Sequence, residues 1–206
     1  METQNILNLL DLLRAMAQEG LSYSKNEYDT ARYNKLLDLA SQQYSTIVDM
    51  PSEKIRGMFL RETGSITPKL GVDSAIMNTE NKLLLLRRND GSWGLPGGWM
   101  DVGESPFETA HREALEETGL HTIPIGYVLV THKTPLTHTG FVSQVNICVA
   151  AKRVPANTKV TLSHEHTAFR WIDEHDEFDN WHPGQQRLIK PAFEAYRKQL
   201  FLPEIS

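Results

Sequence analysis

The chain has 206 residues, of which 40% are hydrophobic and 23% are charged, with 21 Lys and Arg against 26 Asp and Glu. The formal charge of −5 at pH 7 argues against a protein that coats nucleic acid or an anionic membrane, so neither is expected as a partner. Cys148 is the only cysteine, which excludes an intrachain disulfide and favours a cytoplasmic location. The N-terminal segment shows neither a signal peptide nor the unbroken run of about 20 apolar residues that crosses a membrane.

The first third of the chain has helical periodicity. The apolar residues of its first helix recur at intervals of three and four, at Ile6, Leu9, Leu10, Leu13 and Ala17. Gly20 is the expected end of this helix. A second helix is predicted at about 26–48, and a third from near Pro51 to Gly64.

The pattern changes after Pro68. Short apolar and β-branched runs separated by turn residues predict strands, in the order VDSAIM, KLLLLRR, IGYVLVTHK, VSQVNICVAA and FRWI. One helix interrupts them near 106–118, and another is predicted at 185–199, with a kink at Pro191. The sequence therefore predicts an α+β protein with a helical domain at 1–66 and a mixed sheet covered by helices at 67–206.

The helical segment does not have the charge of a DNA-reading module. Residues 1–66 carry seven basic and nine acidic side chains, whereas DNA-binding domains usually have a basic excess. Docking, dimerisation or a contribution to a substrate pocket is the preferred interpretation of these helices.

Residues 97–120, GGWMDVGESPFETAHREALEETGL, join a glycine turn to a helix with clear ends. Ser105, Pro106 and Glu108 form a capping box with proline in the first turn, and Gly119 supplies the stop. The helix carries three carboxylates within five positions, at Glu113, Glu116 and Glu117. They are predicted to lie opposite the packing face formed by Phe107, Ala110, His111, Ala114 and Thr118.

Three carboxylates crowded on one helix repel one another unless a cation lies among them. Their hard oxygen ligands suit Mg²⁺ or Mn²⁺ better than zinc. Gly97 and Gly98 allow a tight turn in which a backbone carbonyl approaches the metal, and Arg112 is placed to orient the carboxylates.

The spacing of these residues resembles a complete Nudix box. The matching positions are Gly98, Glu104, Arg112-Glu113, Ala114, Glu116-Glu117 and Gly119-Leu120. The resemblance implies a Nudix hydrolase with an α/β/α sandwich around a mixed sheet, which hydrolyses a nucleoside diphosphate linked to another moiety X. It also implies that Glu113, Glu116 and Glu117 bind the metal with the carbonyl of Gly97, while Arg112 and Glu104 are supporting charges. No organic cofactor is implied.

The general base is left open between two glutamates. Family members draw it either from the box, where Glu113 is the candidate, or from a later loop, where Glu165 precedes a predicted strand. His164 and His166 flank Glu165 and are expected to be surface or substrate-edge residues, because a zinc site would need two more ligands.

The first third, together with EKIRGMFLRETGSITPKLGVDSAIM, resembles the N-terminal extension of a bacterial Nudix group that includes CDP-choline and ADP-ribose pyrophosphatases. The resemblance implies a homodimer whose N-terminal helices help to form the pocket for X. Four aromatic residues are candidates for stacking on a base or facing a quaternary ammonium: Trp93, Trp99, Tyr127 and Trp181.

Two other functions are compatible with the family. One is a non-catalytic Nudix module that senses a nucleotide and regulates a partner, although the intact glutamate set argues against it. The other is removal of pyrophosphate from the 5′ end of RNA, which the negative charge disfavours.

Overall fold

The computed structural model describes residues 2–62, 64–134 and 142–202, and the side chains from residue 5 onward. The chain forms two compact units, one made of Met1–Lys69 with Lys133–Gln144 and the other of Leu70–His132 with Val145–Ser206. We call them the helical unit and the sheet unit. The boundary between residues 66 and 67 that the sequence suggests stays a prediction.

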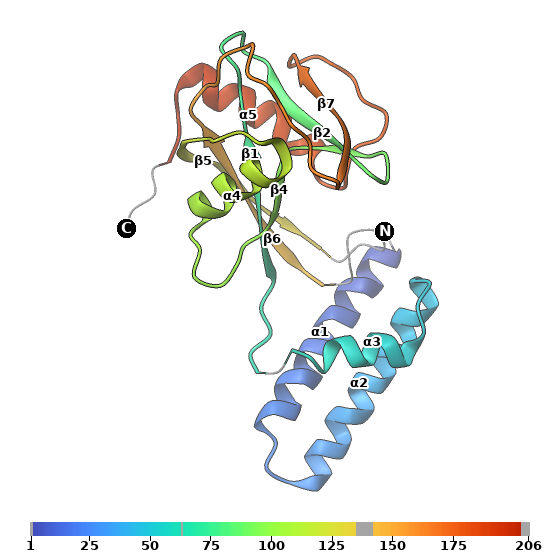
Figure 1. Cartoon of the computed structure of the whole chain (residues 1–206). Helices are drawn as coiled ribbons and strands as arrows, with labels where there is room; N and C mark the ends of the chain where they lie inside the picture. Colours follow the sequence, from blue (N-terminus) through green and yellow to red (C-terminus); the bar gives the residue numbers. More distant parts are fainter. Residues whose placement is uncertain (1, 63, 135–141, 203–206) are drawn as a thin grey trace. The chain divides into compact units, whose positions relative to one another are not determined.

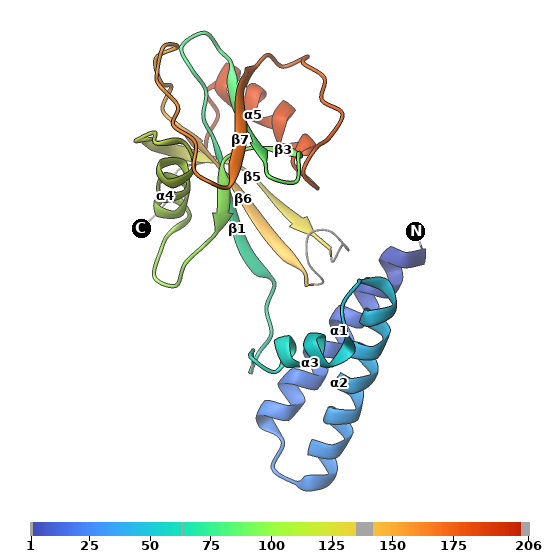
Figure 2. The ribbon, with the colours of Figure 1, turned by 45° about the vertical axis from the view of Figure 1, so that its right-hand side comes forward.

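The helical unit contains three helices, α1 (Glu2–Tyr23), α2 (Glu27–Ile47) and α3 (Ser52–Phe59). Helices α1 and α2 form a hairpin, and α3 lies across it (Figures 1 and 2). Asn26 caps α2 by accepting a hydrogen bond from the Asp29 backbone N–H. The apolar residues of the three helices share one core, formed by Leu7, Leu10, Ala17, Leu37, Tyr44, Val48, Ile55 and Phe59.

The predicted stop of α1 at Gly20 is wrong, because the helix continues to Tyr23. A Cβ at Gly20 would lie 2.3 Å from a ring carbon of Tyr33 on α2. Glycine therefore serves close helix packing at this position, and packing outweighs its weak helix propensity. Helix α3 also ends at Phe59, earlier than the expected Gly64.

The described residues of the sheet unit form nine elements. They are β1 (Lys69–Ala75), β2 (Leu83–Arg88), β3 (Trp93–Gly94), β4 (Gly97–Trp99), α4 (Pro106–Thr118), β5 (Pro124–Lys133), β6 (Gln144–Ala151), β7 (His166–Ile172) and α5 (Gln186–Lys198). One sheet has the order β4-β1-β6-β5 and the other β3-β2-β7. Each predicted apolar run therefore contributes a strand.

Helices α4 and α5 cover opposite sides of the strands (Figures 1 and 2). On the α5 side, Leu188, Ala192 and Tyr196 pack with strand residues that include Ala75 and Cys148. On the other side, the α4 residues Ala110 and Ala114 pack in two further clusters with strand residues such as Val72 and Leu84. This helix–sheet–helix arrangement confirms the predicted sandwich. None of the described helices is long and apolar enough to span a membrane.

Candidate functional site

The glycine turn is held against β1 by its backbone. Strand β4 pairs antiparallel with β1, placing Gly97 opposite Asp73, Gly98 opposite Val72 and Trp99 opposite Gly71. A Cβ at Gly97 would lie 2.3 Å from the Val72 carbonyl oxygen, and one at Gly98 would lie 2.3 Å from Oε1 of Glu113. Gly97 thus permits the strand pairing, while Gly98 makes room for a carboxylate from α4.

Helix α4 has the ends that the sequence predicts. Ser105 and Glu108 form both hydrogen bonds of the capping box, Pro106 lies in the first turn, and Gly119 adopts a left-handed conformation with φ 70°. The helix is therefore fixed at both ends, and the direction of its carboxylates relative to β4 is set.

The three carboxylates of α4 were predicted to lie opposite the packing face of the helix, but two of them are themselves buried. Glu113 and Glu117 are buried, with 9% and 4% of their surface exposed, whereas Glu116 is exposed. The Gly97 N–H donates to Oε2 of Glu117 at 2.9 Å. The helix has a second packed side, because β4 and the segment before β7 lie against it, and the apolar periodicity shows only the first.

Burial makes Glu113 and Glu117 weaker acids than ordinary glutamates. It raises the pKa of Glu117 to about 8, and the charges of Glu113 and Glu165 add to the effect. Burial also raises the pKa of Glu113, against the opposing influence of Arg112. The site therefore holds two carboxylates whose ionised forms need more positive charge than their surroundings supply.

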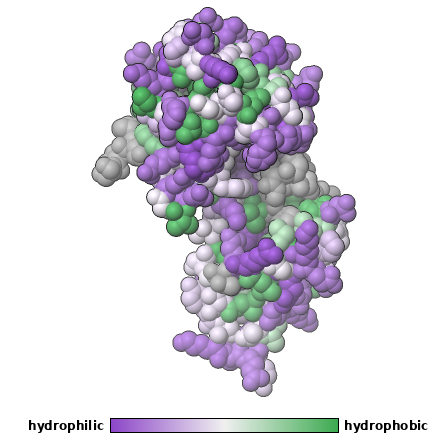
Figure 3. Space-filling model, in the orientation of Figure 1, coloured by the Kyte–Doolittle hydropathy of each residue, from purple (hydrophilic) through white to green (hydrophobic). Residues whose placement is uncertain are grey.

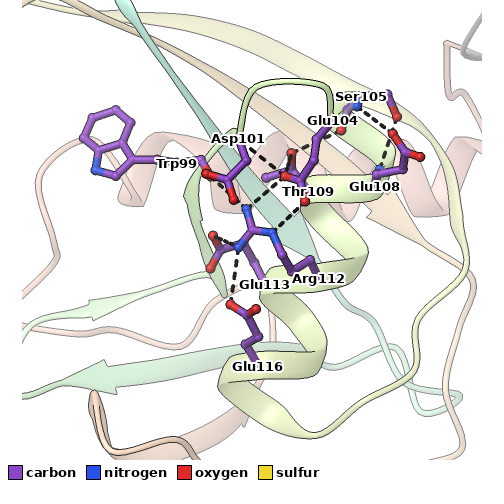
Figure 4. Close-up of polar contacts among 9 residues, drawn as sticks. All are labelled: Trp99, Asp101, Glu104, Ser105, Glu108, Thr109, Arg112, Glu113 and Glu116. Carbon is purple, nitrogen blue, oxygen red and sulfur yellow. Dashed lines mark hydrogen bonds and ion pairs between the residues drawn. The ribbon is translucent and has the colours of Figure 1, made fainter.

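Arg112 is the centre of the polar contacts at the surface of α4 (Figure 4). Its Nε and Nη2 donate to the two oxygens of Glu104 at 2.8 and 3.0 Å, and its Nη1 donates to Glu113 at 2.7 Å. A longer bond of 3.3 Å reaches Glu116. The guanidinium lowers the pKa of Glu104 to about 2. Arg112 thus joins the box glutamates Glu104, Glu113 and Glu116 in one network.

Glu165 and His166, at the start of β7, lie near the buried carboxylates of α4. Glu165 is exposed on a turn, close enough for its charge to raise the pKa of both Glu113 and Glu117. His166 is buried, with Nε2 3.7 Å from Oε1 of Glu117, and its strand partner on β2 is Arg88.

His166 was expected at the surface or at the edge of the substrate, and the structure corrects this placement to a buried position behind Glu117. Arg88 was not a candidate at all. Its charge partly offsets the rise that burial causes in the pKa of Glu117, and it adds to the lowering that burial causes in the pKa of His166. Neither placement has a local signal, because both depend on the pairing of β2 with β7 across a register irregularity.

The polar groups of the site fit a hard divalent cation, because most of them are carboxylate oxygens. Two of the carboxylates, Glu113 and Glu117, are also buried without a full counter-charge. Within the described residues, no three His, Cys, Asp or Glu side chains are gathered as a group that could hold a metal. Arg112 contacts Glu113 and Glu116 instead.

Comparison with known proteins assigns both parts of the chain. A model of the NUDIX domain matches residues 67–192, and a model described as a UDP-X-like, N-terminal oligomerisation domain matches residues 4–59. The chain belongs to the Nudix hydrolase family, which confirms the resemblance drawn from the box.

Individual relatives agree with this assignment. A Bacillus subtilis (strain 168) protein, "Putative ADP-ribose pyrophosphatase YjhB", is 39% identical over 124 residues, which cover 59% of this chain and 59% of the relative. An ADP-ribose pyrophosphatase from Streptococcus suis 89-1591 is 28% identical, with a TM-score of 0.50, over 66% of this chain and 96% of that one. A UDP-X diphosphatase structure shares the fold over 98% of both chains, with a TM-score of 0.56 and 23% identity.

Proposed function

We propose that the protein is a metal-dependent hydrolase of nucleoside diphosphate conjugates of the ADP-ribose or CDP-choline type. It would cleave the pyrophosphate bond to give a nucleoside monophosphate and a phosphorylated X. The observation that carries the proposal is the buried pair Glu113 and Glu117, which lies beside the glycine turn and has raised pKa values. The named activities of the relatives supply the substrate class.

Four groups would hold the cation: the carboxylates of Glu113, Glu116 and Glu117, and the backbone carbonyl of Gly97. When bound there, the cation, Mg²⁺ or Mn²⁺, would supply positive charge that neutralises phosphate oxygens and favours attack by water. The chain's own contribution is to fix these oxygens. Gly97 N–H holds Glu117, and Arg112, itself held by Glu104, holds Glu113.

Glu165 is the preferred general base. It is exposed and near both inner carboxylates, so it can accept a proton from water that enters the site. Glu113 remains the alternative. Its carboxylate accepts a hydrogen bond from Arg112 and is also one of the proposed ligands of the cation, so it is less free than Glu165 to meet water.

The helical unit is proposed to make a homodimer. Its matched family model is described as an oligomerisation domain. Apolar side chains lie among hydrophilic ones on the surface of this unit (Figure 3). Those of α1 include Ile6, Leu9, Leu12 and Met16, which are between 47% and 64% exposed. An exposed apolar stripe on one helix fits contact with a second copy of the chain.

The test is to incubate the protein with Mg²⁺ and a panel of nucleoside diphosphate conjugates and to measure turnover as the release of AMP, CMP or UMP. The wild-type protein should hydrolyse at least one conjugate in preference to capped or triphosphorylated RNA. Glu117→Gln should lower kcat by about a hundredfold or more, as should Glu165→Gln if it is the base. Glu80→Gln, an exposed glutamate on a turn between strands, is the matched control.

Absence of turnover for every conjugate would refute the proposal and favour a sensing module. Near-normal kcat of Glu117→Gln at saturating Mg²⁺ would remove this residue from the ligand set.

A further inference from the structure

The four aromatic residues that are candidates for substrate stacking differ in their surroundings. Trp93 and Trp181 both contact Phe178, with ring centroids 5.3 Å apart in each pair. Tyr127 contacts Phe107 at 5.0 Å. Trp99 is 50% exposed, and no other ring among the described residues pairs with it. Three of the four rings are thus engaged in packing, and one is available to a ligand.

The backbone of Trp99 is tied directly to the carboxylate site. Its carbonyl oxygen accepts a hydrogen bond from Nη2 of Arg112 at 2.9 Å, and the same guanidinium holds Glu113. Gly98, the residue before it, faces the Glu113 carboxylate so closely that a Cβ there would lie 2.3 Å from its Oε1. Since a strand advances about 3.3 Å per residue, the indole begins within a few ångströms of the proposed metal ligands.

The indole does not point into the carboxylate cluster. Figure 4 shows that it extends away from Arg112 and Glu113, while its carbonyl faces the guanidinium. Its cross-strand neighbour is Gly71, which has no side chain to cover the ring. A flat, half-exposed apolar surface therefore lies beside the site, outside the group of charged side chains.

We propose that Trp99 is a substrate-binding residue that stacks on the nucleobase of the conjugate while the pyrophosphate lies at Glu113 and Glu117. The inference rests on the proposed function and adds the residue that recognises the base. A nucleobase fits better than a quaternary ammonium, because cation recognition uses cages of several rings and Trp99 is a single open surface. Stacking on one aromatic ring is also tolerant of base identity.

Steady-state kinetics with ADP-ribose and Mg²⁺ test this role, using an abasic analogue in which hydrogen replaces adenine. Trp99→Ala should raise KM for ADP-ribose about tenfold, a larger effect than on kcat, and should leave KM for the abasic analogue unchanged. Trp99→Phe, which keeps a flat ring, should restore KM to within about threefold of wild type. Val102→Ala, an exposed apolar residue in the following loop, is the matched control and should behave as wild type.

Fluorescence gives a second measurement that needs no turnover. A non-hydrolysable analogue of ADP-ribose, with a methylene group in place of the bridging oxygen of the pyrophosphate, should quench the tryptophan emission of the wild-type protein in Mg²⁺, and Trp99→Phe should lose this quenching. Wild-type turnover with an unchanged KM in Trp99→Ala, or an equal penalty for the abasic analogue, would overturn the stacking role and leave the hydrolase proposal intact. Neither turnover nor quenching in the wild-type protein would overturn both.

Discussion

Glu117 is the side chain of the site whose negative charge is least favourable in the absence of a metal. It is 4% exposed, receives one hydrogen bond from the Gly97 N–H, and has the like charges of Glu113 and Glu165 near it. A carboxylate in these surroundings favours its protonated form, whereas a cation would favour the ionised one. Ionised Glu117 should therefore destabilise the metal-free fold and stabilise the metal-bound fold.

This property predicts how the stability of the metal-free protein depends on pH. The pKa of Glu117 in the folded state, about 8, lies above its ordinary value of 4.5, so the folded state binds the proton more tightly than the unfolded state. Stability from this group is present at low pH and is lost as pH rises toward and through 8. Between pH 7 and 8.5 the loss should be about 1 kcal/mol.

Urea unfolding in EDTA at these two pH values measures the effect. Glu117→Gln should lose most of the dependence and should be the more stable protein at pH 8.5, while Glu80→Gln should follow the wild type. The explanation fails if Glu117→Gln shows the same loss of stability as the wild-type protein. The interval lies above the ordinary pKa of histidine, so His166, whose pKa burial lowers, stays neutral.

Among single residues, the sequence predicts chemistry better than placement. The spacing of Glu104, Arg112 and Glu113 indicates a charged network, and the structure joins these three side chains. The depth of Glu117 and the buried position of His166 were not predicted, because each depends on strands that pack against α4 from elsewhere in the chain. Periodicity identifies one packing face of a helix, and α4 has two.

At the scale of elements, the junction of β4 and α4 is sensitive to added side-chain volume. Gly98→Ala would place a Cβ 2.3 Å from Oε1 of Glu113, a distance that real contacts do not show. The carboxylate is the movable partner, so the fold should survive while Glu113 is displaced. We expect kcat to fall by about tenfold or more and the apparent Mg²⁺ affinity to weaken.

Gly57→Ala is the control for this change, because a Cβ at this helical position meets nothing within 4 Å. It should leave activity unchanged and stabilise α3 by roughly 0.5–1 kcal/mol. Circular dichroism and an Mg²⁺ titration of activity separate the two outcomes. Full activity of Gly98→Ala at low Mg²⁺ would show that the position of Glu113 is not critical.

The helix ends show which elements local sequence specifies. The capping box and Gly119 set α4 correctly, because capping is a contact within a few residues. Gly20 misled the prediction for α1, because its small size serves a contact with Tyr33 on another helix. A glycine in the sequence looks the same at a helix end, as in Gly119, and at a close helix contact, as in Gly20. Only the residue that packs against it distinguishes the two.

At the scale of the whole molecule, the open question is how many copies of the chain assemble. Helix α1 buries Leu7 and Leu10 in the core of its own unit, yet it leaves several large apolar side chains exposed, among them Ile6, Leu9, Leu12 and Met16. Their spacing of three and four places them along one stripe. A stripe of this kind is costly in water unless a partner covers it.

We predict that the stripe is the dimer contact and that two charges on it will separate the copies. The wild-type chain should sediment at twice its monomer mass of 23.4 kDa at micromolar concentration. The double variant Leu9→Glu, Met16→Glu should sediment as a monomer with unchanged helix content, because both side chains already face solvent in the single chain. Leu200→Glu, at an equally exposed apolar position in the sheet unit, should remain a dimer. A monomeric wild-type protein, or a double variant that still sediments as a dimer, would rule out this surface, since two buried glutamates cannot be accommodated in an apolar contact without partners.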